Sequence, residues 1–266
     1  MHFIPINFSD PGFNPDYTAD FQLIIILDSE SFSYAVCHPA TNRLIRVTTG
    51  CLYENLFTTQ NQEKFSASKY QKVIIAANSE SFCLIPDAVF MPENLADFSA
   101  FLSVKEADLI LTDQISTGQN TVIFTLPKDL VYRIEEKYPA TKIQFAPKSW
   151  IKSIVDAKLK DPNLYLFLTE KKLKIVSFDQ ENIRFYNQFE CSTADEVVYF
   201  TALVAEQLNL KPNETSLIIC GEAETENEPM LLLQQFFKQV SFFSGLISKQ
   251  HSLLKQHQIV QFLGLN

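Results

Sequence analysis

Residues 23–36 read LIIILDSESFSYAV, and this stretch decides the fold. Five apolar residues form a run typical of a buried strand, four polar residues beginning with Asp28 follow, and an alternating run comes next. A short cluster of Asp and Ser between two such runs favours a tight turn. The stretch therefore predicts two antiparallel strands joined by a hairpin whose turn contains no glycine.

The same pattern occurs twice in the chain. Residues 22–37 (QLIIILDSESFSYAVC) align without gaps on residues 163–178 (NLYLFLTEKKLKIVSF). Each copy continues through a second turn into a third strand, RLIRVT in one case and NIRFYNQF in the other. A repeat of this kind indicates an internal duplication. The sequence therefore predicts two halves, residues 1–150 and 151–266, each opening with a three-stranded antiparallel meander.

Further strands and helices are predicted after the first meander. Residues 72–77 and 82–86 are expected to form another hairpin, because the polar residues NSES separate two apolar runs. The tetrapeptide SESF occurs in both places, at 29–32 and at 79–82, and we interpret it as a hairpin turn. Residues 108–146 alternate strands with a helix, which indicates an inserted α+β unit or the end of the first half.

The second half shows alternating helices and strands. A helix containing the single Trp150 leads into it, and after the second meander a long helix is predicted to begin at Thr193, where Glu196 completes a capping box. The buried strand SLIICG, a helix around MLLLQQFFKQ and the strand VSFF follow. This mixture of elements defines an α/β (α+β) fold class.

Composition and motifs exclude several classes of function. With 22 Lys and Arg against 31 Asp and Glu, the chain has a formal charge of −9, which opposes nucleic acid and anionic lipid because both bind to basic surfaces. We interpret the local basic cluster Lys171, Lys172 and Lys174 as the solvated face of an alternating strand. No GxSxG motif occurs, and no residue is predicted to be catalytic.

The cysteines and the hydrophobic runs indicate where the protein works. The five cysteines are odd in number and far apart in the sequence, which predicts reduced thiols in a reducing compartment. No CxxC or CxxH spacing occurs, so we expect no metal site. No run of eighteen apolar residues could span a membrane, and the N-terminal residues lack the pattern of a signal peptide. We therefore expect a cytoplasmic protein.

The order of elements also carries a resemblance. The duplicated meander, the run VIFTLPKDLVYRIEEKYPATKIQFAPKSWIKSI and the later SLIICGE resemble the ribonuclease H-like fold of actin, sugar kinases and heat-shock ATPases. Residues 20–245 are similar in layout to actin-like proteins of pilus assembly and type II secretion, and most similar to a bacterial family of unknown function. The resemblance implies a duplicated actin-like ATPase fold. It also implies a partner that is a short segment of another bacterial protein, added to an exposed strand.

The resemblance also implies how active members of that superfamily bind nucleotide. In them, a glycine-containing turn after the first strand of each half holds the nucleotide phosphates. An aspartate opens each turn and organises magnesium and water. The two turns of this chain are Asp28, Ser29, Glu30 and Ser31, then Thr169, Glu170, Lys171 and Lys172. Only the first aspartate matches. The glycine-rich adenosine loop matches only as Cys220, Gly221, Glu222 and Ala223.

These departures matter because phosphate binding to a turn needs outward N–H groups that no Cβ obstructs, a geometry that glycine supplies. Glu30 and Glu170 would also repel a polyphosphate. The chain has six glycines, where average usage would give about nineteen. We interpret Asp28 as a turn residue that caps backbone N–H groups. Gly221 fits either the approach of an adenine or a strand-end glycine with an unusual backbone angle.

Two hypotheses of function follow. The first is a non-catalytic, pseudo-ATPase scaffold that holds no cofactor and binds a protein or peptide. The alternative is a divergent ATPase or kinase that still holds Mg-ATP through Asp28 and the Gly221 loop. The residues expected at a vestigial cleft are Asp28, Ser29, Thr169, Glu170, Gly221 and Glu222. The missing glycines and the lost second aspartate favour the first hypothesis.

Overall fold

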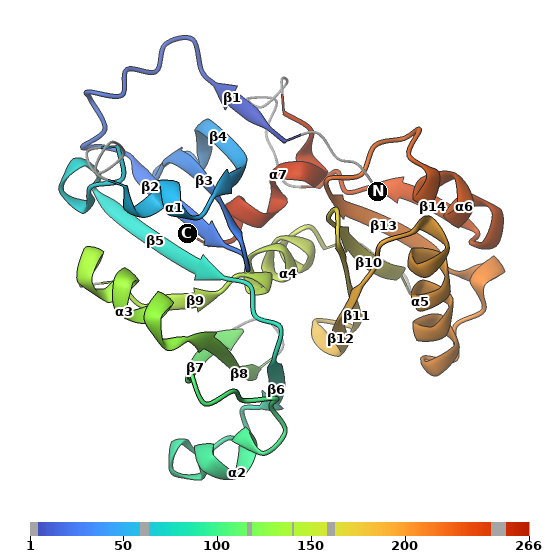
Figure 1. Cartoon of the computed structure of the whole chain (residues 1–266). Coiled ribbons are helices and arrows are strands. Elements are labelled where there is room, and N and C mark those ends of the chain that lie inside the picture. The colour runs from blue at the N-terminus through green and yellow to red at the C-terminus, as the bar shows by residue number, and fades with distance from the viewer. Residues whose placement is uncertain are drawn as a thin grey trace. The chain divides into compact units, whose positions relative to one another are not determined.

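The computed structural model describes residues 5–58, 64–115, 119–139, 141–158, 163–245 and 254–265 (Figure 1). The chain divides into two compact units, one made of Pro5–Ser149 with Leu265 and the other of Trp150–Gly264.

The first unit is built on a six-stranded sheet with the order β1-β4-β3-β2-β5-β9. Its strands are β1 (Asn7–Ser9), β2 (Gln22–Leu27), β3 (Ser31–His38), β4 (Arg43–Leu52), β5 (Lys72–Ala77) and β9 (Ile143–Phe145). Strands β2, β3 and β4 form an antiparallel meander, whereas β5 runs parallel to β2 and to β9. The apolar residues of β2 and β5 are buried, as expected for a parallel pair in the middle of a sheet.

One face of this sheet is covered by short helices and a loop. The helical segments are α1 (Glu54–Phe57), η2 (Ala67–Lys69) and α3 (Lys128–Lys137). Phe65, in the loop, packs its ring on Phe32 and Tyr34 of β3 at centroid distances of 5.5 and 5.1 Å. The Tyr138 hydroxyl, next to α3, donates to the carbonyl of Phe65 over 2.8 Å. Loop and helix therefore hold each other against the meander.

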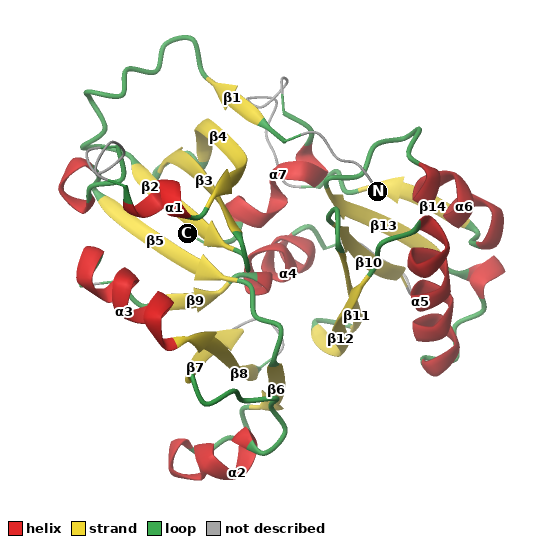
Figure 2. Ribbon diagram, in the orientation of Figure 1, coloured by secondary structure: helices red, strands yellow, loops and turns green. Residues whose placement is uncertain are grey.

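A three-stranded antiparallel sheet with the order β6-β8-β7 is inserted into the first unit (Figure 2). Its elements are β6 (Phe82–Pro86), η3 (Pro92–Asn94), α2 (Leu95–Ser99), β7 (Asp108–Ile115) and β8 (Asn120–Pro127). Asp113 of β7 ties it to β9, since its Oδ2 accepts from Phe145 N over 2.9 Å and lies 2.7 Å from Lys148 Nζ.

The second unit is built on a five-stranded sheet with the order β12-β11-β10-β13-β14. Its strands are β10 (Asn163–Leu168), β11 (Lys172–Asp179), β12 (Asn182–Glu190), β13 (Ser216–Gly221) and β14 (Gln239–Phe242). Its helices are α4 (Pro147–Asp156), which begins before the boundary of the unit, α5 (Ala194–Gln207), η4 (Pro212–Glu214), α6 (Glu228–Phe236) and α7 (Gln256–Leu263).

Helices α5 and α6 cover one face of the second sheet (Figure 2). Leu164, Leu166 and Ile175 of the sheet pack in one buried apolar cluster with Val197 of α5 and Leu233 of α6. Helix α5 begins with the predicted capping box. Thr193 Oγ1 accepts from Glu196 N over 3.2 Å, and Glu196 Oε2 accepts from Thr193 N over 3.0 Å.

The predicted meanders are confirmed in both units. Strands β4, β3, β2, β5 and β9 lie in the same order and with the same relative directions as β12, β11, β10, β13 and β14. The turn residues that the gapless alignment pairs also correspond in the structure. Asp28 directly follows β2, and Thr169 directly follows β10. The first unit differs by the short strand β1, which pairs antiparallel with β4.

The prediction that residues 72–77 and 82–86 form a hairpin is wrong. Both are strands, but β5 belongs to the six-stranded sheet and β6 to the three-stranded sheet. SESF is therefore a hairpin turn at 29–32 and a crossover between two sheets at 79–82. The buried Ser79 fixes the crossover, because its Oγ lies 2.8 Å from the carbonyl oxygens of both Ser81 and Thr125 and can donate its one proton to either.

Candidate functional site

The first candidate turn is closed by its own residues. Asp28 N donates to Ser31 O over 2.8 Å, which joins β2 to β3. Ser29 N donates to Asp28 Oδ1 over 3.1 Å. Ser29 and Glu30 are exposed. An N–H group that a phosphate would need in this turn is therefore already bound by a carboxylate that would repel the phosphate.

Asn78 lies beside Asp28, and the sequence analysis did not single it out. Asn78 N donates to Leu27 O over 2.9 Å, and its Nδ2 donates to Asp28 Oδ2 over 3.4 Å. The contact arises because β2 and β5 are parallel, so that their carboxyl ends lie at one edge of the sheet. A polar residue directly after the buried strand KVIIAA was the signal that could have identified it.

The second turn has the same closure with different side chains. Thr169 N donates to Lys172 O over 2.9 Å, as Asp28 does to Ser31. Thr169 Oγ1 accepts from Lys172 N over 3.2 Å. Glu170 and Lys171 are exposed. A threonine hydroxyl thus caps this turn where the first turn has a carboxylate, and a hydroxyl without charge is a poorer ligand for Mg²⁺.

Gly221 stands where two strands approach closely. Its φ is +92°, and a Cβ added to it would lie 2.1 Å from Leu168 O. Glu222 N donates to that same carbonyl over 2.8 Å. In the first sheet Leu27 pairs with Ala77 as Leu168 pairs with Gly221, so an alanine occupies the corresponding position there. The backbone geometry of β13 is by itself sufficient reason for a glycine at 221.

The structure gathers the candidate residues into two groups. Thr169, Glu170, Gly221 and Glu222 lie at the carboxyl ends of the parallel strands β10 and β13 in the second unit. Asp28 and Ser29 lie at the end of β2 in the first unit, with Asn78. Each group occupies the edge where open α/β sheets bind ligands.

Helix α7 holds the loop that follows Gly221. His257 Nε2 is 3.0 Å from the carbonyl of Ala223, and the His257 ring stacks on Phe242 with centroids 4.2 Å apart. Gln258 Nε2 donates to Glu224 Oε1 over 2.9 Å, and Lys255 forms an ion pair with Glu224. Burial lowers the pKa of His257. The loop that resembles an adenosine site therefore packs against the chain's own C-terminal helix.

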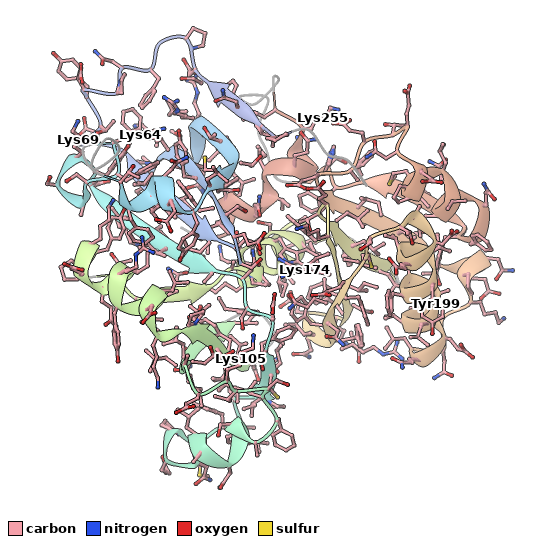
Figure 3. The ribbon with its side chains drawn as sticks, in the orientation of Figure 1. Lys64, Lys69, Lys105, Lys174, Tyr199 and Lys255 are labelled. Atoms are coloured by element: carbon pink, nitrogen blue, oxygen red, sulfur yellow. The ribbon has the colours of Figure 1, made fainter. Side chains whose placement is uncertain are left out.

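The interpretation of Lys171, Lys172 and Lys174 as one solvated face is wrong at Lys174. Its side chain is 5% exposed, and its Nζ lies 5.4 Å from the centroid of the Phe167 ring (Figure 3). Strand β11 lies inside the sheet, between β10 and β12, and is covered on both faces, so alternation does not bring Lys174 to solvent.

Within the described ranges, no group of three or more His, Cys, Asp and Glu side chains is arranged to hold a metal ion. Among the described helices, none is long and apolar enough to cross a membrane. The five cysteines, all in the described ranges, are free.

Comparison with solved structures identifies the fold. A Bacteroides thetaiotaomicron protein with an actin-like ATPase fold and unknown function matches with a TM-score of 0.76 and 19% identity, over 87% of this chain and 93% of that one. A PilM–PilN type IV pilus biogenesis complex matches with a TM-score of 0.58 and 9% identity, over 92% and 97%. Together with the two meanders and the parallel strands beside them, these matches define an actin-like ATPase fold.

The family is identified by the sequence itself. Residues 10–240 match the family described as "Protein of unknown function (DUF3822)", and the chain belongs to this family. The resemblance to a family of unknown function with this fold is thereby confirmed. A search of curated proteins found no match.

Proposed function

We propose that this protein is an actin-like protein that has lost nucleotide chemistry and binds another protein or a peptide. One observation carries the proposal. At both turns where phosphates would bind, the opening residue uses its own side chain to hold a backbone N–H of the turn, Asp28 at Ser29 and Thr169 at Lys172. Neither turn contains a glycine.

The charges around the turns support the same conclusion. Glu30 and Glu170 are the exposed acidic residues of the two turns, and the second turn has lost its aspartate to Thr169. One carboxylate, that of Asp28, would remain to organise Mg²⁺, which binds weakly to a single carboxylate without a well-placed phosphate. Metal and nucleotide are therefore both disfavoured.

Protein binding is supported by analogy of fold. The PilM–PilN structure is a complex in which a protein of similar fold binds a second protein. Fold alone does not carry function, so the partner of this chain is proposed here only as a protein or peptide. We also propose that the protein acts in the cytoplasm of a bacterium. Its five free thiols support a reducing compartment, and the bacterial origin rests on the sequence resemblance alone.

The alternative remains a divergent ATPase or kinase. The observation in its favour is the position of Asp28, at the carboxyl end of a parallel strand pair and bonded to Asn78. At such edges open α/β sheets bind nucleotides.

ADP formation from Mg-ATP tests the proposal against an ATPase, which transfers the phosphoryl group to water. A kinase forms ADP only with its acceptor substrate, so it is tested by the binding of Mg-ATP in a calorimetric titration. We expect purified protein to form ADP no faster than buffer, and Asp28→Ala to change nothing. Steady turnover above buffer that is lost in Asp28→Ala would establish the alternative. The Lys105→Gln variant, altered in the inserted sheet unit, is the matched control for contaminating ATPase.

A further inference from the structure

Three buried polar atoms without hydrogen-bond partners lie on the helix-covered face of the first meander. They are Tyr34 Oη of β3, and Arg46 Nε and Thr48 Oγ1 of β4. Tyr34 and Thr48 are directly opposite each other in the antiparallel pair, and Arg46 is two residues along the same strand, on the same face. The great majority of buried polar groups are paired, so three together require an explanation.

Two cations flank the Tyr34 ring at this place. Lys64 Nζ lies 4.6 Å from the ring centroid and Arg46 Cζ lies 6.0 Å from it. Tyr70 fixes the backbone beside Lys64, because its hydroxyl donates to Lys64 O over 3.1 Å. Within the described part of the chain, neither Arg46 nor Lys64 has a carboxylate within ion-pair distance, although the protein as a whole carries a charge of −9.

The second unit shows that the fold does not need this polar cluster. The alignment of the two meanders puts Ile175 at the position of Tyr34, and Ile175 packs in a wholly apolar cluster beneath α5 and α6. An apolar side chain therefore serves the packing at this position. The Tyr34 hydroxyl adds a buried donor, which costs free energy unless something accepts a hydrogen bond from it.

The three unpaired polar atoms are buried, whereas parts of the side chains around them remain exposed. Tyr34 is 1% exposed, whereas Arg46, Thr48 and Lys64 are half-buried as whole residues. Arg46 Nε–H is a donor only, and the two hydroxyls can donate. Both cations lie near the Tyr34 ring, and among the described residues no carboxylate lies within ion-pair distance of either, an arrangement that complements an oxyanion.

We propose that Tyr34, Arg46, Thr48 and Lys64 form a binding site for a doubly charged oxyanion, the phosphate of a small molecule. Two cations match the two charges of a phosphate monoester, and three neutral or charged donors match its several acceptor oxygens. A monocarboxylate would leave one cation without a partner. The site lies on the helix-covered face of the first sheet and is formed without Asp28 or Asn78, so it is independent of the candidate turns.

Titration with inorganic phosphate, followed by calorimetry and by the thermal midpoint in HEPES and chloride, tests the proposal. We expect wild-type protein to release or absorb heat on binding and to be stabilised by phosphate. In Arg46→Met the affinity should fall by at least about tenfold, because a charged donor is lost. In Tyr34→Phe it should fall by about fivefold, because only one hydrogen bond is lost.

Tyr34→Phe keeps the aromatic ring and its packing, so it still tests the proposal if Arg46→Met does not fold. Without phosphate we expect it to be at least as stable as wild type, because it removes a buried unpaired hydroxyl. Lys105→Gln is the matched control, since it removes one positive charge at a place that Figure 3 shows well separated from Lys64. It should bind phosphate like wild type.

Glycerol 3-phosphate, titrated in parallel, identifies the source of the anion. Tighter binding than inorganic phosphate assigns the site to a phosphate ester, and equal or weaker binding assigns it to the free ion. The proposal is overturned if phosphate up to about 50 mM changes neither the heat nor the thermal midpoint, a range that would detect even millimolar affinity. It is also overturned if Arg46→Met and Lys105→Gln bind phosphate equally.

Discussion

Single residues distinguish the two halves of this fold at corresponding positions. Gly221 and Ala77 occupy corresponding positions at the ends of β13 and β5, yet only Gly221 has a positive φ and a carbonyl 2.1 Å from its missing Cβ. Asp28 and Thr169 correspond in the same way and cap their turns through different chemistry. The replacements are local, and the backbone of each turn is kept.

Gly221→Ala should destabilise the protein strongly. The substitution places a Cβ against Leu168 O and forces alanine into a left-handed backbone conformation, so we expect a loss of about 2–3 kcal/mol in the free energy of unfolding. Urea denaturation at neutral pH measures the loss.

Gly50→Ala is the matched control for this prediction. Gly50 also has a positive φ, +69°, but an added Cβ would meet nothing closer than Pro5 at 3.8 Å. Backbone strain alone should cost about 1 kcal/mol. Equal losses in the two variants would show that the contact with Leu168 does not determine the residue at 221.

For single residues, the sequence predicted the positions of the turns better than the side-chain contacts made there. The turns at Asp28 and Thr169 were located correctly, because strand and turn residues alternate clearly around them. The Asn78–Asp28 hydrogen bond and the unpaired Tyr34 hydroxyl could not be predicted, because each depends on a neighbouring strand far away in the sequence. For Gly221 the sequence left two explanations open, and the close approach of β10 supplies a sufficient one.

At the scale of elements, helix α7 is attached to the second unit through contacts that include a titratable histidine, His257. His257 contacts both the Ala223 carbonyl and the Phe242 ring, and Glu224 is held by Lys255 and Gln258. These contacts fasten α7 to the loop that follows β13.

The unfolding free energy should fall as the pH drops below 6.5. Burial lowers the pKa of His257 below its ordinary value of 6.5, so the unfolded chain binds more protons than the folded one between these two values. The contribution of neutral His257 is complete above pH 6.5 and is lost as the pH falls through the lowered pKa. His257→Phe keeps the stack on Phe242 and removes the titration.

Denaturation midpoints of wild type and His257→Phe, compared at pH 7.5 and pH 5.5, isolate this residue from the other histidines. We expect the stability of wild type relative to the variant to be greater at pH 7.5. A difference between the two proteins that is the same at both pH values would show that His257 does not link α7 to pH.

The sequence predicted strands and helices well where their apolar residues recur with a regular period. It predicted less well which strands pair with each other in one sheet. The six meander strands and the capped helix α5 occur as expected. The supposed hairpin at 72–86 failed because two adjacent strands with a polar link can equally enter different sheets. Lys174 was misjudged because alternation shows the face of a strand but not what covers that face. Helix α7 (QHQIVQFL) was not predicted, since Gln and His interrupt its apolar residues.

At the scale of the whole molecule, the chain has an actin-like ATPase fold. The two sheets share one strand order and set of directions, while the turns after β2 and β10 both lack glycine and the second opens with Thr169 where the first has Asp28. The fold was predictable because it depends on a repeated pattern of many residues. The loss of nucleotide binding that we propose depends instead on a few side chains at the two turns, which no repeated pattern specifies.

Calorimetric titration of the intact protein with Mg-ATP tests this central claim most directly. We predict no specific binding, with any dissociation constant weaker than about 1 mM. Heat that Arg46→Met removes and Asp28→Ala leaves unchanged would belong to the proposed phosphate site of the first meander. A dissociation constant in the low micromolar range that is lost in Asp28→Ala would contradict the claim and identify a divergent ATPase or kinase.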